Sequence, residues 1–178
     1  MTGKEIKARR LKNFEQVVSE YEAALLRYAA RILQDYDAAQ DVVQDAFIKL
    51  FKSWKEELTP SPQVSCWLYR VVHNCAVDYL RKIARKRILH LRHAAEQADT
   101  VPPDRGDAFR LSEAAERAVT ALHALDLREQ QLVILKIYEE KSYREISDIT
   151  GLTVSNVGYI LHHAMKKMSE HIKNTDAK

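Results

Sequence analysis

Apolar residues recur at intervals of three and four along most of the chain, the spacing of one face of an α-helix. A first stripe runs from Phe14 to Ile32, and a second from Ala39 to Trp54. Asp35 and Asp37 precede the second stripe and can cap its N-terminus. That helix should end near residue 58, because the Thr-Pro-Ser-Pro run that follows cannot continue it. The pattern predicts two long helices joined by a tight turn.

A third long helix is expected from about Ser65 to the low nineties, and the pattern then breaks. The segment AAEQADTVPPDRGDAF, starting at Ala94, holds two adjacent prolines, a glycine, four acids and one arginine. Four shorter helices are expected beyond it, at residues 112–124, 128–139, 142–149 and 154–172. The chain is therefore predicted to be all-α. Two small helical domains, 1–93 and 112–178, are joined by a flexible acidic linker, 94–111.

The scarcity of glycine and proline, four of each in 178 residues, supports a helical fold, and 46% hydrophobic residues suffice for small helical cores. Cys66 and Cys75 lie nine residues apart on one predicted helix, so they point to opposite faces and cannot form a disulfide with each other. The pair His90 and His93 lacks a third ligand for a metal site. The chain shows no signal peptide and no long apolar run. We expect a soluble, cytoplasmic protein without membrane insertion, metal or cofactor.

One side of the second helix combines acidic, amide and apolar residues. Asp41, Gln44, Asp45 and Ile48 line up at intervals of three and four, opposite the apolar stripe, so an isoleucine lies among acids where water is expected. A single exposed apolar side chain is common on proteins. The face is therefore either an ordinary surface or a docking site.

The third helix ends in a basic run. Residues 79–95 include six lysines and arginines and no acid, although the net charge of the whole chain is only +3. Trp67, Tyr69, His73 and Asn74 lie just upstream. Aromatic rings beside a basic groove suit unpaired nucleic acid, because bases stack on the rings while cations hold the phosphates. The alternative is a solvated helix face.

Residues 142–168 have the layout of a helix-turn-helix. A first helix should bury Tyr143, Ile146 and Ile149, and Gly151 should form the turn. The second helix has an inner apolar stripe from Val157 to Met168. Its outward residues are Asn156, Tyr159, His162, His163 and Lys166. Such patterns indicate a helical hairpin, and DNA binding is one of its uses.

Three segments together resemble bacterial sigma factors of the extracytoplasmic-function (ECF) type: DVVQDAFIKLFKSW from Asp41, CWLYRVVHNCAVDYLRKIARKR from Cys66, and ALHALDLREQQLVILKIYEEKSYREIS before the turn. The resemblance extends in order from about Phe14 to Lys173. It implies a sigma region 2-like domain and a region 4-like domain. It also implies a non-enzymatic transcription initiation factor that binds core RNA polymerase and promoter DNA, both as duplex and as melted single strand. ECF sigma factors commonly have an anti-sigma partner, so the resemblance further implies a regulatory protein of that kind.

The resemblance also implies site residues. The residues that would contact the clamp helices of core polymerase are Asp41, Gln44, Asp45 and Ile48. The residues that would bind the minus-ten element, in order to melt and read it, are Ser61, Ser65, Trp67, Tyr69, Arg70, His73, Asn74, Arg81, Lys82 and Arg85. The C-terminal domain would dock on the polymerase flap and read the minus-thirty-five element through Arg144, Ser155, Asn156, Tyr159, His162, His163 and Lys166.

The last helix departs from the family pattern, because positions that are usually basic hold Gly158, Ile160, His163 and Met165. Missing arginines remove phosphate contacts and bidentate guanine contacts, the latter worth ~1–3 kcal/mol each in discrimination. Two hypotheses follow. Either the chain reads an unusual upstream element through Tyr159, His162 and His163, or it binds upstream DNA weakly and needs a recruiting partner protein or an unusually good minus-ten match.

Two other functions are compatible with parts of the sequence. A helix-turn-helix regulator that acts without polymerase would leave the basic third helix unexplained. A sigma mimic that titrates an anti-sigma protein would not need so basic a helix. An enzyme is not indicated, because no phosphate-binding glycine loop, HExxH motif or paired nucleophile and base appears.

Overall fold

The computed structural model describes residues 3–54, 58–93 and 112–176, and within those ranges all regular structure is helical. The expected linker, 94–111, lies outside them. The elements are α1 (Gly3–Leu33), α2 (Tyr36–Ser53), α3 (Pro62–His93), α4 (Glu113–His123), α5 (Leu127–Val133), η1 (Ile134–Tyr138), α6 (Tyr143–Thr150) and α7 (Val154–Asp176). The all-α prediction is confirmed.

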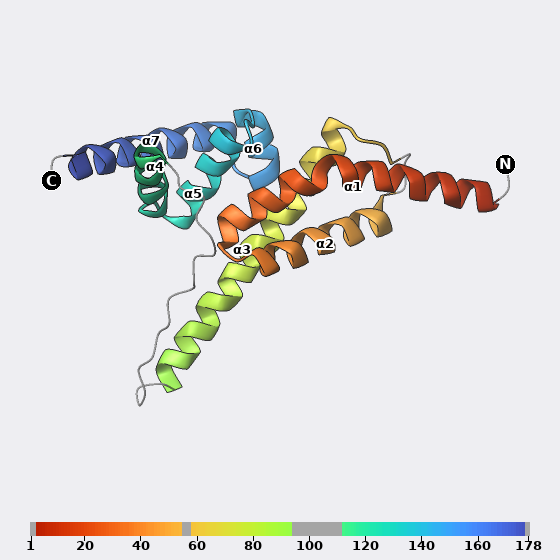
Figure 1. Cartoon of the computed structure of the whole chain (residues 1–178), viewed down its shortest axis with the longest axis horizontal. Coiled ribbons are helices and arrows are strands. Elements are labelled where there is room, and N and C mark those ends of the chain that lie inside the picture. Colours follow the sequence, from red (N-terminus) through yellow and green to blue (C-terminus); the bar gives the residue numbers. More distant parts are fainter. Residues whose placement is uncertain (1–2, 55–57, 94–111, 177–178) are drawn as a thin grey trace.

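Helices α1, α2 and α3 pack together through one apolar core (Figure 1). Leu25 and Tyr28 of α1, Leu50 of α2 and Leu68 of α3 are fully buried there. The α1–α2 turn passes through Gln34, which has a positive φ of 54°. Asp35 then caps α2 as expected, since its carboxylate accepts a hydrogen bond from the Ala38 N–H at 3.0 Å.

Helix α2 ends at Ser53, earlier than the sequence suggested, although Leu58 is still buried against the core. Helix α3 is longer than predicted, because it begins at Pro62, where proline is well tolerated at the first helical position. Its C-terminal half extends away from the rest of the molecule (Figure 1).

The C-terminal helices α4 to α7 form the second domain. Asp126 and Ser142 each make a complete capping box, with Glu129 and Glu145 respectively, as their spacing predicted. The helix expected at 128–139 is divided, because α5 passes at Ile134 into a short π-helix, η1. Nothing in the local sequence signals that change, which belongs to a class of irregularity that often accompanies functional sites.

The helix-turn-helix prediction is confirmed in its main features. Gly151 adopts a left-handed conformation, φ 74°, between α6 and α7, and Ile146 and Ile149 are buried. The prediction for Tyr143 was wrong, since its side chain is 43% exposed. The ring lies on the surface beside Gly158 of α7, where an added Cβ would come within 3.5 Å of Tyr143 Cε2. That separation is an ordinary van der Waals contact, so an alanine at position 158 would also fit beside the ring.

Candidate nucleic-acid interface

The predicted docking face of α2 is fully presented to solvent. Asp41, Gln44 and Asp45 are exposed, and Ile48 keeps 43% of its surface accessible. The opposite face buries the apolar stripe, including Val43, Ala46 and Leu50. An apolar side chain flanked by carboxylates is therefore available to a partner on a rigid helix.

Within the apolar stripe of α2, the Phe51 side chain is not buried but 37% exposed. Its ring meets the Phe14 ring edge-on at a centroid separation of 5.0 Å, and the Arg10 guanidinium lies 4.9 Å from its centroid. Arg10 also donates to the Phe51 carbonyl. Helix α1 thereby covers the C-terminal end of α2, which fixes the orientation of the docking face.

The basic part of α3 is also open to solvent. Arg81, Lys82, Arg85 and Lys86 are all exposed on the half of α3 that projects from the molecule (Figure 1). Arg81 makes an exposed ion pair with Asp78 at 3.3 Å, of a kind that water and salt weaken strongly. These cations are positioned to contact a polyanion without rearrangement.

The loop before α3 is anchored at Ser61, where it joins the helix. Ser61 Oγ accepts from the Val64 N–H at 3.3 Å, and its carbonyl accepts from the Tyr21 hydroxyl at 3.1 Å. Ser65 is half-buried, as is Trp67, whose indole meets Trp54 edge-on at 6.3 Å. Trp67 packs against the core with part of its surface accessible.

Tyr69 and His73 are buried, at 4% and 6% exposure, so neither reaches the surface in this arrangement. His73 Nδ1 lies 2.9 Å from the Tyr28 hydroxyl, with which it shares a hydrogen bond. Burial lowers the pKa of His73 to about 4, so the imidazole is neutral near pH 7. Burial, followed by the hydrogen bond to Glu139, raises the pKa of Tyr69. Their contact with DNA, predicted from the sequence, would require the surrounding helices to move.

Two further residues of this part of α3 face the C-terminal domain. Arg70 Nε donates to the Asp148 carbonyl of α6 at 2.7 Å. Asn74 is exposed and lines an open cavity of about 630 Å³ between α3 and the C-terminal domain. Gln131, on the opposite wall, has a buried Nε2 without a hydrogen-bond partner. The domains thus meet over the predicted minus-ten surface, but they do not fill the space between them.

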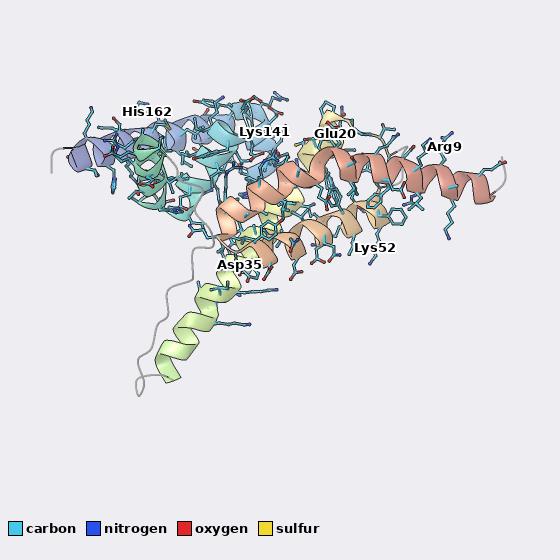
Figure 2. All side chains as sticks on the ribbon, viewed as in Figure 1. Arg9, Glu20, Asp35, Lys52, Lys141 and His162 are labelled. Atoms are coloured by element: carbon cyan, nitrogen blue, oxygen red, sulfur yellow. The ribbon has the colours of Figure 1, made fainter. Side chains whose placement is uncertain are left out.

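The outward face of α7 carries rings rather than charge. Tyr159 is 67% exposed, its ring lies 4.3 Å from that of His163, and His162 meets His163 edge-on at 5.7 Å. Lys166 is exposed on the same helix, and Figure 2 shows His162 further along α7 than the domain junction marked by Lys141. The other residues predicted for duplex contact, Arg144, Ser155 and Asn156, are exposed as well. The structure brings this predicted set onto one domain.

Sequence reasoning missed the residues that join the two domains. Glu139, at the end of η1, accepts from Arg31 Nη1 at 3.2 Å and from the Tyr69 hydroxyl at 2.7 Å. Arg31 and Glu139 are 108 positions apart, and no periodicity or motif links positions so distant. Only a covarying pair among related sequences could have indicated this contact.

A helical domain with an exposed basic helix, joined to a helix-turn-helix domain, is typical of a DNA-binding protein. Comparison with known families agrees. Residues 17–86 match sigma-70 region 2, and residues 115–168 match sigma-70 region 4.

The similar proteins identified by sequence are sigma factors as well. The chain is 24% identical to the RNA polymerase sigma factor SigV of Bacillus subtilis (strain 168), over 89% of this chain and 90% of that protein. It is also 24% identical to the ECF RNA polymerase sigma factor SigW of the same strain, over 90% and 89%. The solved structure of the sigma factor RpoE with the anti-sigma factor NepR, from Bartonella quintana, shares the fold with a TM-score of 0.66 and 21% identity, covering 91% of this chain and 98% of that chain. CnrH in complex with the cytosolic domain of CnrY gives a TM-score of 0.61 at 22% identity, over 90% and 88%.

The chain belongs to the sigma-70 family and is a sigma factor of the ECF type, a transcription initiation factor. Across the part of the chain that the structure describes, no group of three or more His, Cys, Asp or Glu side chains could hold a metal ion. No helix among those residues is both long and apolar enough to cross a bilayer.

Proposed function

We propose that the chain directs core RNA polymerase to promoters through three surfaces. Asp41, Gln44, Asp45 and Ile48 on α2 dock on the clamp helices of the core enzyme. The α3 helix and the loop before it melt the minus-ten element and hold its single strand. The outward face of α7 contacts upstream duplex, and the protein acts by binding rather than by catalysis, in the cytoplasm.

The observation that carries this proposal is the separation of two open surfaces on the N-terminal domain. The acidic and apolar face of α2 and the cations Arg81, Lys82 and Arg85 of α3 are exposed at the same time, on different helices. A protein partner and a nucleic acid can therefore bind together. A repressor that used only its helix-turn-helix would need neither surface.

The α7 face supports an unusual mode of upstream contact. Its rings and amides can stack and form hydrogen bonds with bases, but among the outward residues predicted on α7 only Lys166 carries a permanent positive charge. Either an unusual element is read by Tyr159, His162 and His163, or upstream binding is weak and a recruiting protein or an unusually good minus-ten match is needed. The similar structures with NepR and CnrY support an anti-sigma partner for this chain as well.

Run-off transcription tests the proposal, with bacterial core polymerase and a pool of promoter fragments from the host. Asp45→Ala and Asn74→Ala should each abolish specific transcripts, the first by preventing core binding and the second by weakening capture of an unpaired base. Glu22→Ala and Asn174→Ala are the matched controls, because both residues are exposed and lie on other helices than the proposed α2 and α3 surfaces.

Gel filtration with core polymerase separates the alternatives. Core binding without transcripts would support a titrating mimic. Tight binding to duplex fragments by the protein alone, without core binding, would identify an ordinary helix-turn-helix regulator and refute the proposal.

A further inference from the structure

A cavity of about 630 Å³ lies between α3 of the N-terminal domain and the helices α5 and α6 of the C-terminal domain. Pockets that hold small molecules commonly measure roughly 300–1,000 Å³, so this volume is that of a ligand site. The packing of the two domains creates the space without filling it. The wall that the C-terminal domain contributes belongs to none of the three surfaces proposed above.

Gln131 of α5 brings an unsatisfied hydrogen-bond donor to this cavity. The residue is only 5% exposed, it lines the cavity, and its Nε2 has no hydrogen-bond partner. A buried donor without an acceptor is costly, because it has given up water and gained nothing in return. The last torsion of a glutamine side chain is broad, so the amide can turn toward an occupant. The cavity therefore favours an occupant with an acceptor oxygen.

Two guanidinium groups favour a negative charge on that occupant. Arg128 of α5 and Arg81 of α3 line the cavity from opposite domains, and both are exposed. Arg81 pairs with Asp78 of its own helix at 3.3 Å, in an exposed contact that water weakens. Within the described residues, Arg128 takes part in no hydrogen bond or ion pair. Guanidinium groups bind carboxylates and phosphates through paired hydrogen bonds.

Four apolar side chains line the same cavity. Leu132 is buried at 1% exposure, Leu127 is 40% exposed, and Val77 and Leu152 are half-buried. Ligand pockets typically combine apolar walls with a few polar groups that fix the orientation of the ligand. The combination of leucines, one amide donor and two cations suits a molecule with an apolar body and an anionic group.

We propose that this cavity binds a small organic anion, with an apolar body and a carboxylate or phosphate group. The anionic group contacts Arg128 and Arg81, and one of its oxygens accepts a hydrogen bond from Gln131 Nε2. The apolar body lies against Leu127 and Leu152. Neither polymerase nor DNA is needed to test this site, so it can fail without the function proposed above failing, and the reverse also holds.

Fluorescence titration of the full chain with anilinonaphthalene sulfonate tests the site. This dye joins an aromatic body to an anionic group, and its emission rises when it leaves water. Phenylnaphthylamine is the matched neutral dye, because it has a similar body and no sulfonate. The two dyes separate the contribution of the guanidinium groups from that of the apolar wall.

Arg128→Ala should weaken binding of the anionic dye about tenfold, the usual effect of losing a hydrogen bond to a charged group, and leave the neutral dye unchanged. Arg27→Ala is the control of equal charge, because Arg27 is exposed on α1 and does not line the cavity. Equal losses for the two variants would make net charge the cause and overturn the site. A loss of both dyes in Arg128→Ala would overturn the role of the anionic group.

Two further variants test the donor and the space. Gln131→Leu should weaken binding of the anionic dye about fivefold, and it should not destabilise the protein in urea, because it removes an unsatisfied donor and keeps the shape of the side chain. Val77→Trp should fill the cavity and abolish binding of both dyes, whereas Ile83→Trp, on the exposed part of α3, should not. Circular dichroism confirms that each variant is folded.

Binding that survives both Arg128→Ala and Val77→Trp would locate the dye elsewhere and overturn the proposal. Displacement of the bound dye by naphthyl phosphate or by naphthoate distinguishes the two kinds of anionic group. If neither compound displaces it, the cavity does not accept a phosphate or carboxylate, and the proposed ligand class is wrong.

Discussion

The two helices proposed to contact DNA, α3 and α7, differ in charge and in accessibility. The projecting half of α3 carries four exposed cations between Arg81 and Lys86, whereas the outward face predicted on α7 combines Lys166 with the rings of Tyr159, His162 and His163. Phosphate contacts supply affinity and base contacts supply specificity. The difference therefore assigns most of the electrostatic binding to α3 and leaves α7 to act through stacking and hydrogen bonds.

The histidines of α3 and α7 also differ in their exposure to solvent. His73 of α3 is 6% exposed and bonded to Tyr28, while His162 and His163 of α7 are in contact with solvent. One histidine belongs to the N-terminal core, and the others belong to a surface. The difference between α3 and α7 can be tested by measuring DNA binding for the exposed cations and protein stability for the buried histidine.

The largest effect is expected from removing the α3 cations. The triple variant Arg81→Ala, Lys82→Ala and Arg85→Ala should weaken binding to a labelled 30-nucleotide thymidine strand by about 100-fold at low salt. The slope of log K against log salt should become shallower by about 2, because each lost single-strand phosphate contact contributes about 0.7. Fluorescence anisotropy across a salt series measures both quantities.

A charge-matched control replaces Lys7, Lys12 and Lys173, which are exposed elsewhere on the molecule, with alanine. This variant should keep the wild-type slope. If both triple variants lose affinity equally, net charge rather than the α3 surface governs binding, and the assignment of electrostatic binding to α3 is wrong.

The next effect concerns the buried histidine. The pKa of His73 is lowered to about 4 in the folded protein, against 6.5 in an unfolded chain, so between these values the unfolded state binds more protons. Stability must therefore fall as the pH falls through this window. From pH 7.5 to pH 5 the loss attributable to His73 should be about 2 kcal/mol, at ~1.4 kcal/mol per unit of pKa shift.

Urea unfolding followed by tryptophan fluorescence measures this loss. The chain's two tryptophans, Trp54 and Trp67, both lie in the N-terminal domain and report on it selectively. His73→Gln removes the titrating group and should flatten the pH dependence by that amount. His162→Gln, on the exposed face of α7, should leave it unchanged. An unaltered pH profile in His73→Gln would show that the imidazole is not buried in solution.

The sequence predicted those features that depend on neighbouring residues. The apolar stripes, the Asp35 cap, both capping boxes and the Gly151 turn are confirmed, because each follows from spacings of a few positions. Tyr143 was assigned to the core on the same reasoning, and that prediction was wrong. Its ring lies at the surface beside Gly158 of α7 and under the Lys136 ammonium of η1, and periodicity within α6 cannot show neighbours on other elements.

The same distinction holds for the candidate site: exposure that follows from local helical periodicity could be predicted, and burial caused by contact between the domains could not. The exposure of Asp45 and Arg81 follows from helical periodicity, so their surfaces could be located from the sequence. The enclosure of Tyr69 could not, because it depends on Glu139, 70 positions further along the chain. The π-helix that ends beside Glu139 is equally unsignalled. Contacts made by the packing of whole domains leave no pattern in either segment alone.

The smallest effect is expected on α7, where charge can be added rather than removed. His163→Arg together with Met165→Arg adds cations at two exposed positions where the resemblance to ECF sigma factors predicts basic residues. Each new phosphate contact with duplex should steepen the salt dependence by about 0.9, and the affinity for a random 30-base-pair duplex should rise about fivefold. His163→Gln with Met165→Gln is the uncharged control.

The outcome decides between the two hypotheses for upstream contact. If the arginine variant gains affinity and also transcribes from promoters without a recruiting protein, weak phosphate contact is what limits the natural α7 helix. If it gains affinity for random duplex but loses transcription from its own promoters, the rings of Tyr159, His162 and His163 read a specific element that the added arginines disturb. An unchanged salt slope would show that α7 does not lie against duplex DNA, so that α3 alone would account for binding.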